Sequence, residues 1–209
     1  QTYQNLELII TDDCSTDGTK NILEKYKSLP NVFIYYNESN LGFIKNFEKA
    51  ASLAKANYIC FSDQDDIWLP NKVQQLFNAI ADKSMVYSNS LLIDDNDNSL
   101  GKYLSDYKFL SNIHFSECFS FFNAVSGHTM MIRREVIENG LPIPNSKYHD
   151  WWLAFVASNI NGITYIDTVL THYRQHAQTI TKTKTKKNVK SRTKIKRFQE
   201  FEEKLQWLQ

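Results

Sequence analysis

One stretch, residues 58–70, constrains the fold more than any other part of the chain. It opens with a run of four apolar residues, which is long enough for a buried strand and too short for a helix. Three carboxylates follow within four positions, at Asp63, Asp65 and Asp66, and Pro70 stands where a new helix would begin. A strand that ends in acids places them at the carboxyl end of a sheet, where open α/β sheets bind their ligands.

Carboxylates this close repel one another, so we expect positive charge beside them. Their oxygens suit Mg²⁺ or Mn²⁺, and either ion in turn holds phosphate oxygens. The alternative is a solvated acidic turn that caps the next helix, and helix capping is the role that we favour for Asp66.

The 209 residues, 42% of them hydrophobic, indicate one globular domain. Apolar periodicity predicts strands alternating with helices as far as residue 93. The strands are expected at 6–11, 32–36, 58–61 and 85–93, with helices after Gly18, at 43–56 and at 71–81. This order is typical of an α/β fold with a mostly parallel sheet and helices on both faces, in which the 58–61 strand is central.

The second half of the chain is less regular. No element is assigned over 101–126, and further elements are expected as a strand at 127–132, helices at 133–138 and 150–158, one or two strands within 163–173, and an amphipathic helix at 192–209. A doubly wound sheet usually begins with a central strand that leads into the ligand site. The first predicted strand here resembles the second of such a sheet, so we expect the sequence to lack its first βα unit.

Charge divides the chain into an acidic body and a basic tail. Residues 182–209 hold ten Lys and Arg against three Glu, whereas the rest holds 14 basic and 20 acidic residues. A basic tail of this kind favours a negatively charged partner. Three widely spaced cysteines without a CxxC pair favour reduced thiols in the cytosol and make zinc improbable. We find neither a membrane-spanning run nor a signal peptide in the sequence.

Six segments carry a family resemblance. They are Gln1–Tyr3 with Leu6–Gly18, Asn40–Gly42 with Asn46, Ser62–Pro70, Gly127–Arg134, His149–Trp152 and Tyr173–His176. In this order they resemble the inverting glycosyltransferases of family 2, which have the GT-A fold, and more closely the bacterial cell-surface-polysaccharide branch described as rhamnosyltransferase-like. The resemblance runs from residue 1 to about 181. It implies a GT-A domain at 1–181, N-terminally truncated, followed by a basic linker and helix at 182–209.

The resemblance implies metal-dependent, inverting transfer of a sugar from a nucleotide-sugar to a hydroxyl of a growing cell-surface polysaccharide or lipid-linked glycan. Such a transfer needs a divalent cation to neutralise the leaving diphosphate and one base to take the proton of the attacking hydroxyl. Inversion is a single displacement, so no covalent nucleophile is required.

The resemblance also implies site residues on the donor side. Asp63 and Asp65 match the DxD motif, with Asp65 as a metal ligand and Asp63 contacting metal or ribose. Asp13 matches the acid that contacts the nucleotide, and Asn40 and Gly42 match a loop near the donor. The alternatives are a turn-forming cluster for Asp13 and helix capping for Asn40 and Gly42.

On the acceptor side, Asp150 matches the catalytic base, and Trp151, Trp152 and Gly127 fit an acceptor wall because aromatic faces suit sugar rings. The alternatives are an N-cap Asp before two core tryptophans and a tight turn at the glycine. His176 matches a position near the diphosphate, where it is either a ligand of metal or phosphate or a plain loop histidine.

Other functions remain open at this point. A sugar nucleotidyltransferase shares a related fold but usually carries an early Gly-rich phosphate loop. An aspartyl-phosphate phosphatase has its nucleophile after the first strand and not in mid-chain. A non-enzymatic anion-binding protein would use residues 182–209; nucleic acid is disfavoured because the basic run lacks aromatics before Phe198 and the body is acidic. We expect instead that this tail contacts an anionic membrane surface, which places the protein in the cytoplasm at the inner face of the plasma membrane.

Overall fold

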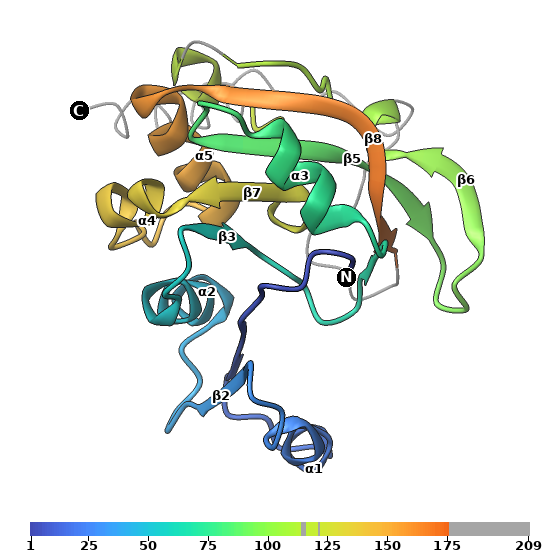
Figure 1. Cartoon of the computed structure of the whole chain (residues 1–209), viewed down its shortest axis with the longest axis vertical. Helices are drawn as coiled ribbons and strands as arrows, with labels where there is room; N and C mark the ends of the chain where they lie inside the picture. Colours follow the sequence, from blue (N-terminus) through green and yellow to red (C-terminus); the bar gives the residue numbers. More distant parts are fainter. Residues whose placement is uncertain (114–115, 121, 176–209) are drawn as a thin grey trace, which may run out of the picture.

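The computed structural model describes residues 1–113, 116–120 and 122–175. The predicted helix at 192–209, the basic linker and His176 lie outside the described residues. Within these ranges the chain forms two sheets of unequal size, with helices packed on them (Figure 1).

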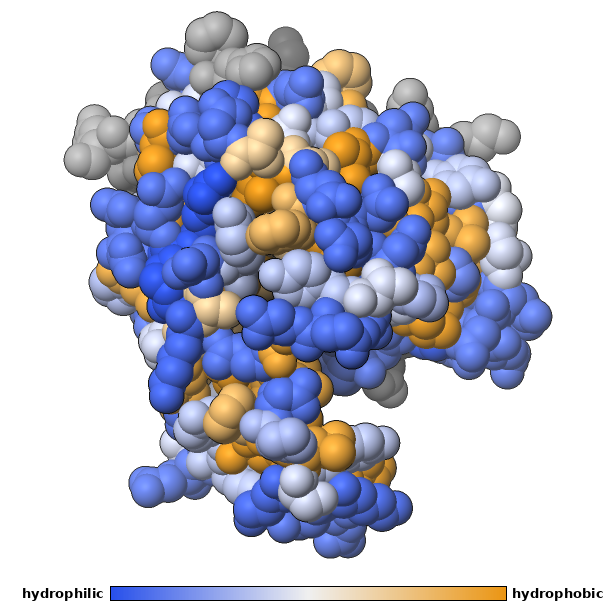
Figure 2. Space-filling model, viewed as in Figure 1, coloured by the Kyte–Doolittle hydropathy of each residue, from blue (hydrophilic) through white to orange (hydrophobic). Residues whose placement is uncertain are grey.

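The smaller sheet is a parallel pair, β1 (Leu8–Asp12) and β2 (Val32–Tyr36), in register from Leu8 opposite Val32 to Asp12 opposite Tyr36. The connection between them contains α1 (Thr19–Leu23) and a short 3-10 turn (Glu24–Tyr26). These elements form a lobe below the larger sheet in Figure 1. Figure 2 shows a hollow between the lobe and the body on the right of the same view.

The larger sheet has the strand order β3-β7-β5-β8-β4, with β6 paired to β5. Its strands are β3 (Tyr58–Cys60), β4 (Ile67–Trp68), β5 (Met85–Ile93), β6 (Ser99–Tyr103), β7 (Met130–Arg133) and β8 (Ile163–Arg174). β5 and β8 run parallel, and the pairs β3–β7, β7–β5, β5–β6 and β8–β4 are antiparallel.

The predicted α/β class is confirmed, but the strand directions differ from the mostly parallel sheet that we expected. The reason is β7, which inserts antiparallel between β3 and β5. This insertion makes β3 an edge strand of the larger sheet, although the sequence suggested that it is central. β7 follows the irregular residues 101–129, where the apolar pattern gave no indication of topology.

Helices cover both faces of the larger sheet, as predicted. They are α2 (Phe43–Leu53), α3 (Lys72–Ala79), α4 (Arg134–Gly140) and α5 (His149–Ile160). Side chains alternate along β7: Met130 and Ile132 join the core with α4 and α5, whereas Met131 joins the core with Leu76 of α3. Figure 1 shows α3 on the near face of the sheet and α5 on the far one. The burial of both faces fixes the register of the strands that carry the site.

Two strand edges face the space between the sheets. Among the described residues, β1 pairs with β2 alone and β3 with β7 alone. The lobe also exposes large apolar side chains: Leu8, Ile22, Tyr26, Leu29, Phe33 and Tyr35. Exposed strand edges and apolar faces are normally covered in soluble proteins.

In the part of the chain that the structure describes, no helix combines the length and the apolar composition that crossing a membrane requires.

Candidate active site

The acidic loop lies between β3 and β4, and it carries three carboxylates at Asp63, Asp65 and Asp66. Asp63 is half-buried. Burial, followed by the negative charges of Asp65 and Asp150, raises the pKa of Asp63 to about 6. Asp150 lies 87 positions further along the chain, so the fold brings the predicted base and the predicted DxD motif close together.

Asp66 faces inward and its side chain is fully buried. Its Oδ1 accepts a hydrogen bond from the backbone N–H of Arg174 at 3.0 Å. Its Oδ2 lies 3.9 Å from Nδ1 of His128 and has no hydrogen-bond partner among the described residues. Burial raises the pKa of Asp66 to about 7. The helix-capping role that we favoured for Asp66 is wrong, because α3 begins six positions later and Asn71 is its N-cap.

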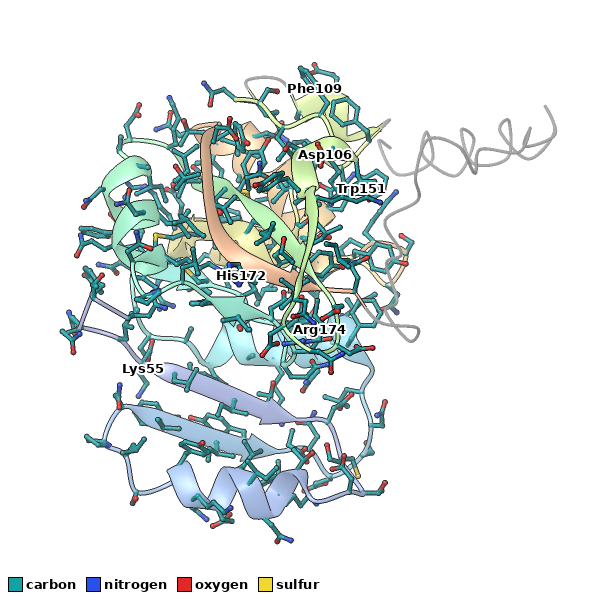
Figure 3. All side chains as sticks on the ribbon, turned by 90° about the vertical axis from the view of Figure 1, so that its right-hand side faces the viewer. Lys55, Asp106, Phe109, Trp151, His172 and Arg174 are labelled. Atoms are coloured by element: carbon teal, nitrogen blue, oxygen red, sulfur yellow. The ribbon has the colours of Figure 1, made fainter. Side chains whose placement is uncertain are left out.

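Arg174, at the end of β8, ties the acidic loop to the turn after β5. Its Nε donates to the Asp65 carbonyl at 2.9 Å and its Nη1 to the Asp94 carbonyl at 2.7 Å. Its Nη2 pairs with Asp97 at 2.5 Å. Figure 3 shows Arg174 at the lower end of β8, on the side of the body toward the β1–β2 lobe. Arg174 therefore holds the acidic loop through the Asp65 carbonyl and the Asp66 side chain.

The predicted donor residues come together at the end of β1. Asp13 Oδ1 accepts hydrogen bonds from the N–H of Leu41 at 2.7 Å and from Asn37 Nδ2 at 2.8 Å, and Oδ2 accepts from the N–H of Gly42 at 2.9 Å. Asn40 Nδ2 donates to the Asp13 carbonyl at 3.1 Å. Burial tends to raise the pKa of Asp13, but these hydrogen bonds outweigh it and hold that pKa below its usual value. Asp13 therefore stays ionised and orders the loop that carries Asn40 and Gly42.

Gly42 has a positive φ of 79°, a conformation that side chains with a Cβ rarely adopt. The sequence did not single out Asn37, which links Asp13 to Asn46 through a second hydrogen bond of 2.9 Å. Its position directly after the β2 strand was the available signal, because polar residues at strand ends tend to gather at one edge of a parallel pair.

Asp150 lies in the first turn of α5. Tyr148 is the N-cap, so the N-cap alternative for Asp150 is wrong. Its Oδ1 accepts a hydrogen bond from the N–H of Trp151 at 2.7 Å. Gly127 packs directly against this turn: a Cβ added there would lie 2.7 Å from Nε2 of His149 and 3.7 Å from Cβ of Asp150. A glycine is therefore required for the close approach of these two segments.

The two tryptophans after Asp150 are half-buried, and they use their indole N–H groups within the fold. Nε1 of Trp151 donates to the Phe119 carbonyl at 2.6 Å, and Nε1 of Trp152 donates to the Gly140 carbonyl at 2.5 Å. Both rings pack against the main core. Their contribution to an acceptor wall stays a prediction.

A buried polar group beneath the acidic loop was not predicted. His128 is buried; it hydrogen-bonds Ser90 Oγ through Nε2 at 2.9 Å and stacks on Tyr173 with ring centroids 4.2 Å apart. Lys72 is fully buried, and burial lowers its pKa to about 7 against the opposing influence of nearby acids. A lysine at the start of a helix is usually solvated, so only the tertiary structure shows that Lys72 is buried.

The chemistry of this acidic site fits a divalent cation. Asp63, Asp66 and His128 each offer a ligand atom, and these atoms lie within 4.8 Å of one another. Burial and then the neighbouring acids raise the pKa of Asp63, and the buried Oδ2 of Asp66 has no hydrogen-bond partner among the described residues, so a cation here would favour the ionised carboxylates. Of the metal ligands predicted from the sequence, Asp63 belongs to this group of three residues. Asp65 lies in the same loop but outside the group.

Residues 1–141 match the family described as "Glycosyl transferase family 2". The chain belongs to this family. The resemblance seen in the sequence is thereby confirmed, and the family assignment disfavours the nucleotidyltransferase and phosphatase alternatives.

Several relatives of this family 2 chain are glycosyltransferases by name. The dTDP-rhamnosyl transferase RfbG of Shigella flexneri is 36% identical over 191 residues, which cover 82% of this chain and 63% of RfbG. The putative teichuronic acid biosynthesis glycosyltransferase TuaG of Bacillus subtilis is 35% identical over 89 residues, or 42% of this chain and 35% of TuaG. This chain therefore spans about one third to two thirds of the length of these two relatives.

The fold of this family 2 chain also matches a solved structure. S. aureus TarS in complex with UDP-GlcNAc aligns with a TM-score of 0.61 at 19% identity, covering 81% of this chain and 50% of TarS. This similarity confirms the predicted GT-A fold.

The charge repulsion at Asp63 generates a testable prediction. An acid whose folded-state pKa is raised destabilises the folded protein once the pH exceeds its unfolded-state pKa, so stability falls as the pH rises from 4 to about 6. In EDTA at pH 7 we expect Asp63→Asn to raise the free energy of unfolding by on the order of 1–2 kcal/mol, and by much less at pH 4. Urea unfolding at the two pH values measures this.

The exposed Asp95→Asn is the matched control, and it should leave stability unchanged at both pH values. A gain for Asp63→Asn that is equal at pH 4 and pH 7 would contradict the charge explanation.

Proposed function

We propose that this chain carries out metal-dependent, inverting transfer of a sugar from a nucleotide-sugar to a hydroxyl of a growing cell-surface polysaccharide or lipid-linked glycan. The observation that carries the proposal is an acidic group with the spacing of a metal site, at Asp63, Asp66 and His128, in a chain that belongs to glycosyltransferase family 2. A single displacement needs a proton acceptor on one side of the reacting carbon and charge neutralisation of the leaving diphosphate on the other.

The acidic loop is the proposed donor-phosphate end of the site. Asp65 and Asp63 would hold Mg²⁺ or Mn²⁺, since both carboxylates are partly accessible from the loop surface. The ion would supply Lewis-acid stabilisation of the leaving diphosphate. Arg174 fixes the main chain of this loop, so the carboxylates are pre-positioned before the donor arrives.

The loop ordered by Asp13 is the proposed nucleotide end. Its hydrogen bonds hold Asn40 and Gly42 next to the end of β1, and the positive φ of Gly42 allows the backbone to approach a ligand closely. The carboxyl end of a parallel pair is the usual place for a nucleotide in α/β folds.

Asp150 is the proposed base. Its place in the first turn of α5, beside the buried His149, keeps it partly shielded from water. Gly127 lets the 127–129 segment pack against this turn, and together with Trp151 and Trp152 it would line the acceptor side. One base is enough for inversion of configuration.

The names of relatives support the substrate classes. WfaP of Escherichia coli, 26% identical over 94% of this chain and 76% of WfaP, is named a UDP-Glc:alpha-D-GlcNAc-diphosphoundecaprenol beta-1,3-glucosyltransferase. TarS was solved with UDP-GlcNAc. We therefore propose a nucleotide-sugar donor and a glycan or lipid-linked acceptor.

We also retain the division into a GT-A domain at 1–181, N-terminally truncated, and a basic segment at 182–209. The facing edges of β1 and β3, together with the exposed apolar side chains of the lobe, support a place for one more βα unit, of roughly 25–35 residues, between the two sheets. A form of the protein extended upstream by that length would then transfer sugar better than this chain.

Loss of the metal is the first test of this function. We expect Asp65→Asn to abolish transfer, because an amide oxygen lacks the charge that binds the divalent ion. EDTA should abolish transfer by the parent protein, and added Mn²⁺ or Mg²⁺ should restore it. A radiolabelled nucleotide-sugar panel measures the product, and undiminished turnover in EDTA would reject metal dependence.

Loss of the base is the second test. We expect Asp150→Asn to leave donor binding nearly intact and to lower turnover by roughly 10²–10⁴-fold, the usual contribution of a general base. Calorimetric titration with the donor separates the two effects. A comparable loss of donor affinity would instead assign Asp150 to the donor site.

The basic segment gives a third test. Nine basic and no acidic residues occupy 182–197, and each basic residue near an anionic surface contributes about 1 kcal/mol of attraction. We propose that this segment attaches the protein to the inner face of the plasma membrane. Co-sedimentation should show binding to vesicles rich in phosphatidylglycerol and not to neutral ones, with loss after deletion of 182–209. Binding that survives the deletion would refute this role.

A further inference from the structure

Lys72, the first residue of α3, has a buried ammonium group beneath the acidic loop. Its side chain is fully buried. Its Nζ donates a hydrogen bond to the His128 carbonyl at 2.5 Å and lies 3.7 Å from the centroid of the Trp68 ring. A buried ammonium is costly unless it is paired, so its position calls for a specific compensating charge.

Asp66 is the buried carboxylate on the same side of the fold. Only one of its two oxygens, Oδ1, has a hydrogen-bond partner, the N–H of Arg174, while Oδ2 is directed toward Nδ1 of His128 at 3.9 Å. His128 cannot easily move away, because Ser90 holds Nε2 and Tyr173 stacks on the ring. The ammonium of Lys72 and the carboxylate of Asp66 thus both lie buried against His128, and each favours the charged form of the other.

We propose that Lys72 is a positioning residue for the transfer reaction: its ammonium is the fixed counter-charge of Asp66, and it holds in place the loop whose Asp63 and Asp65 receive the divalent cation. This inference rests on the proposed function. Lys72 is fully buried, so it acts through Asp66 and does not contact the donor.

The same geometry separates two positive charges in the site. Asp63, Asp66 and His128 have the spacing of a metal site; in our proposal the ammonium of Lys72, bonded to the His128 carbonyl, takes the place of a metal on the inner side of this group. The exchangeable metal is thereby directed outward, to Asp63 and Asp65. A buried ammonium on the inner side and an exchangeable metal on the outer side would together allow three acids to lie within four positions in a folded protein.

A double-mutant cycle tests the charge pair. The four proteins are the parent, Lys72→Met, Asp66→Asn and the double variant, with exposed Lys102→Met as the matched control. Removing one member of a buried pair leaves an uncompensated charge, whereas replacing both is often tolerated. Two properties are measured: the temperature of unfolding, and the binding of Mn²⁺ alone, followed by the electron paramagnetic resonance signal of the free ion.

We expect each single variant to unfold at a lower temperature than the parent and to bind Mn²⁺ about tenfold more weakly, a change of about 1.4 kcal/mol. The double variant should regain Mn²⁺ binding to within about threefold of the parent and should unfold at a higher temperature than either single variant. Lys102→Met should match the parent in both measurements.

A double variant that is no better than Lys72→Met, in stability or in Mn²⁺ binding, overturns the inference, because Lys72 would then only fill space. The proposed function fails separately: a parent that binds no Mn²⁺ and transfers no sugar rejects metal-dependent transfer. The unfolding temperatures then still decide whether Lys72 and Asp66 form the charge pair.

Discussion

Negative charge is concentrated in the loop between β3 and β4, and the surrounding structure is arranged to hold it. Three carboxylates within four positions repel one another strongly in a partly dry site. Arg174 binds the loop through its main chain, and Lys72 brings an ammonium beneath it. Burial, together with the repulsion that remains between the acids, raises the pKa values of Asp63 and Asp66. This concentration of negative charge supports the proposal that the site holds a divalent cation together with the diphosphate of a donor.

Segments far apart in the sequence meet at this loop. β8 brings Arg174 from the end of the described chain, α5 brings Asp150, and the 127–129 segment brings His128. The larger sheet makes this possible because β8 lies between β5 and β4, so its carboxyl end reaches the acidic loop. Gly127 completes the arrangement by letting its segment touch the start of α5. The site is thus built on strand and helix ends whose register is fixed by the cores on both sheet faces.

The sequence predicted best what depends on local periodicity. The β2 and β5 strands have their expected bounds, and α2 begins at Phe43 as expected. Asp13, Asn40 and Gly42 meet through hydrogen bonds, while their contact with a nucleotide stays a prediction. The order of the strands was harder to predict from the sequence, because β7 follows an irregular segment and its insertion beside β3 depends on long-range pairing. The two-residue β4 and the exposed β6 are too short or too polar to show a pattern.

The partners of the site residues were the hardest to predict. We interpreted Asp66 as a helix cap because Pro70 indicated a helix nearby. Its buried carboxylate instead accepts a hydrogen bond from Arg174 and lies beside His128. Lys72 was not singled out from the sequence, because lysines are seldom fully buried. Sequence spacing gives the residue types in a loop, but only tertiary packing decides which of them face inward.

The most direct test is the position of Mn²⁺ in crystals soaked with Mn²⁺ and either UDP or dTDP, located by anomalous scattering. We predict one Mn²⁺ peak within coordination distance of the Asp65 and Asp63 carboxylates, with diphosphate oxygens completing its ligands and Lys72 still bonded to the His128 carbonyl. A peak held between Asp66 and His128, or nucleotide bound away from the acidic loop, would contradict the account.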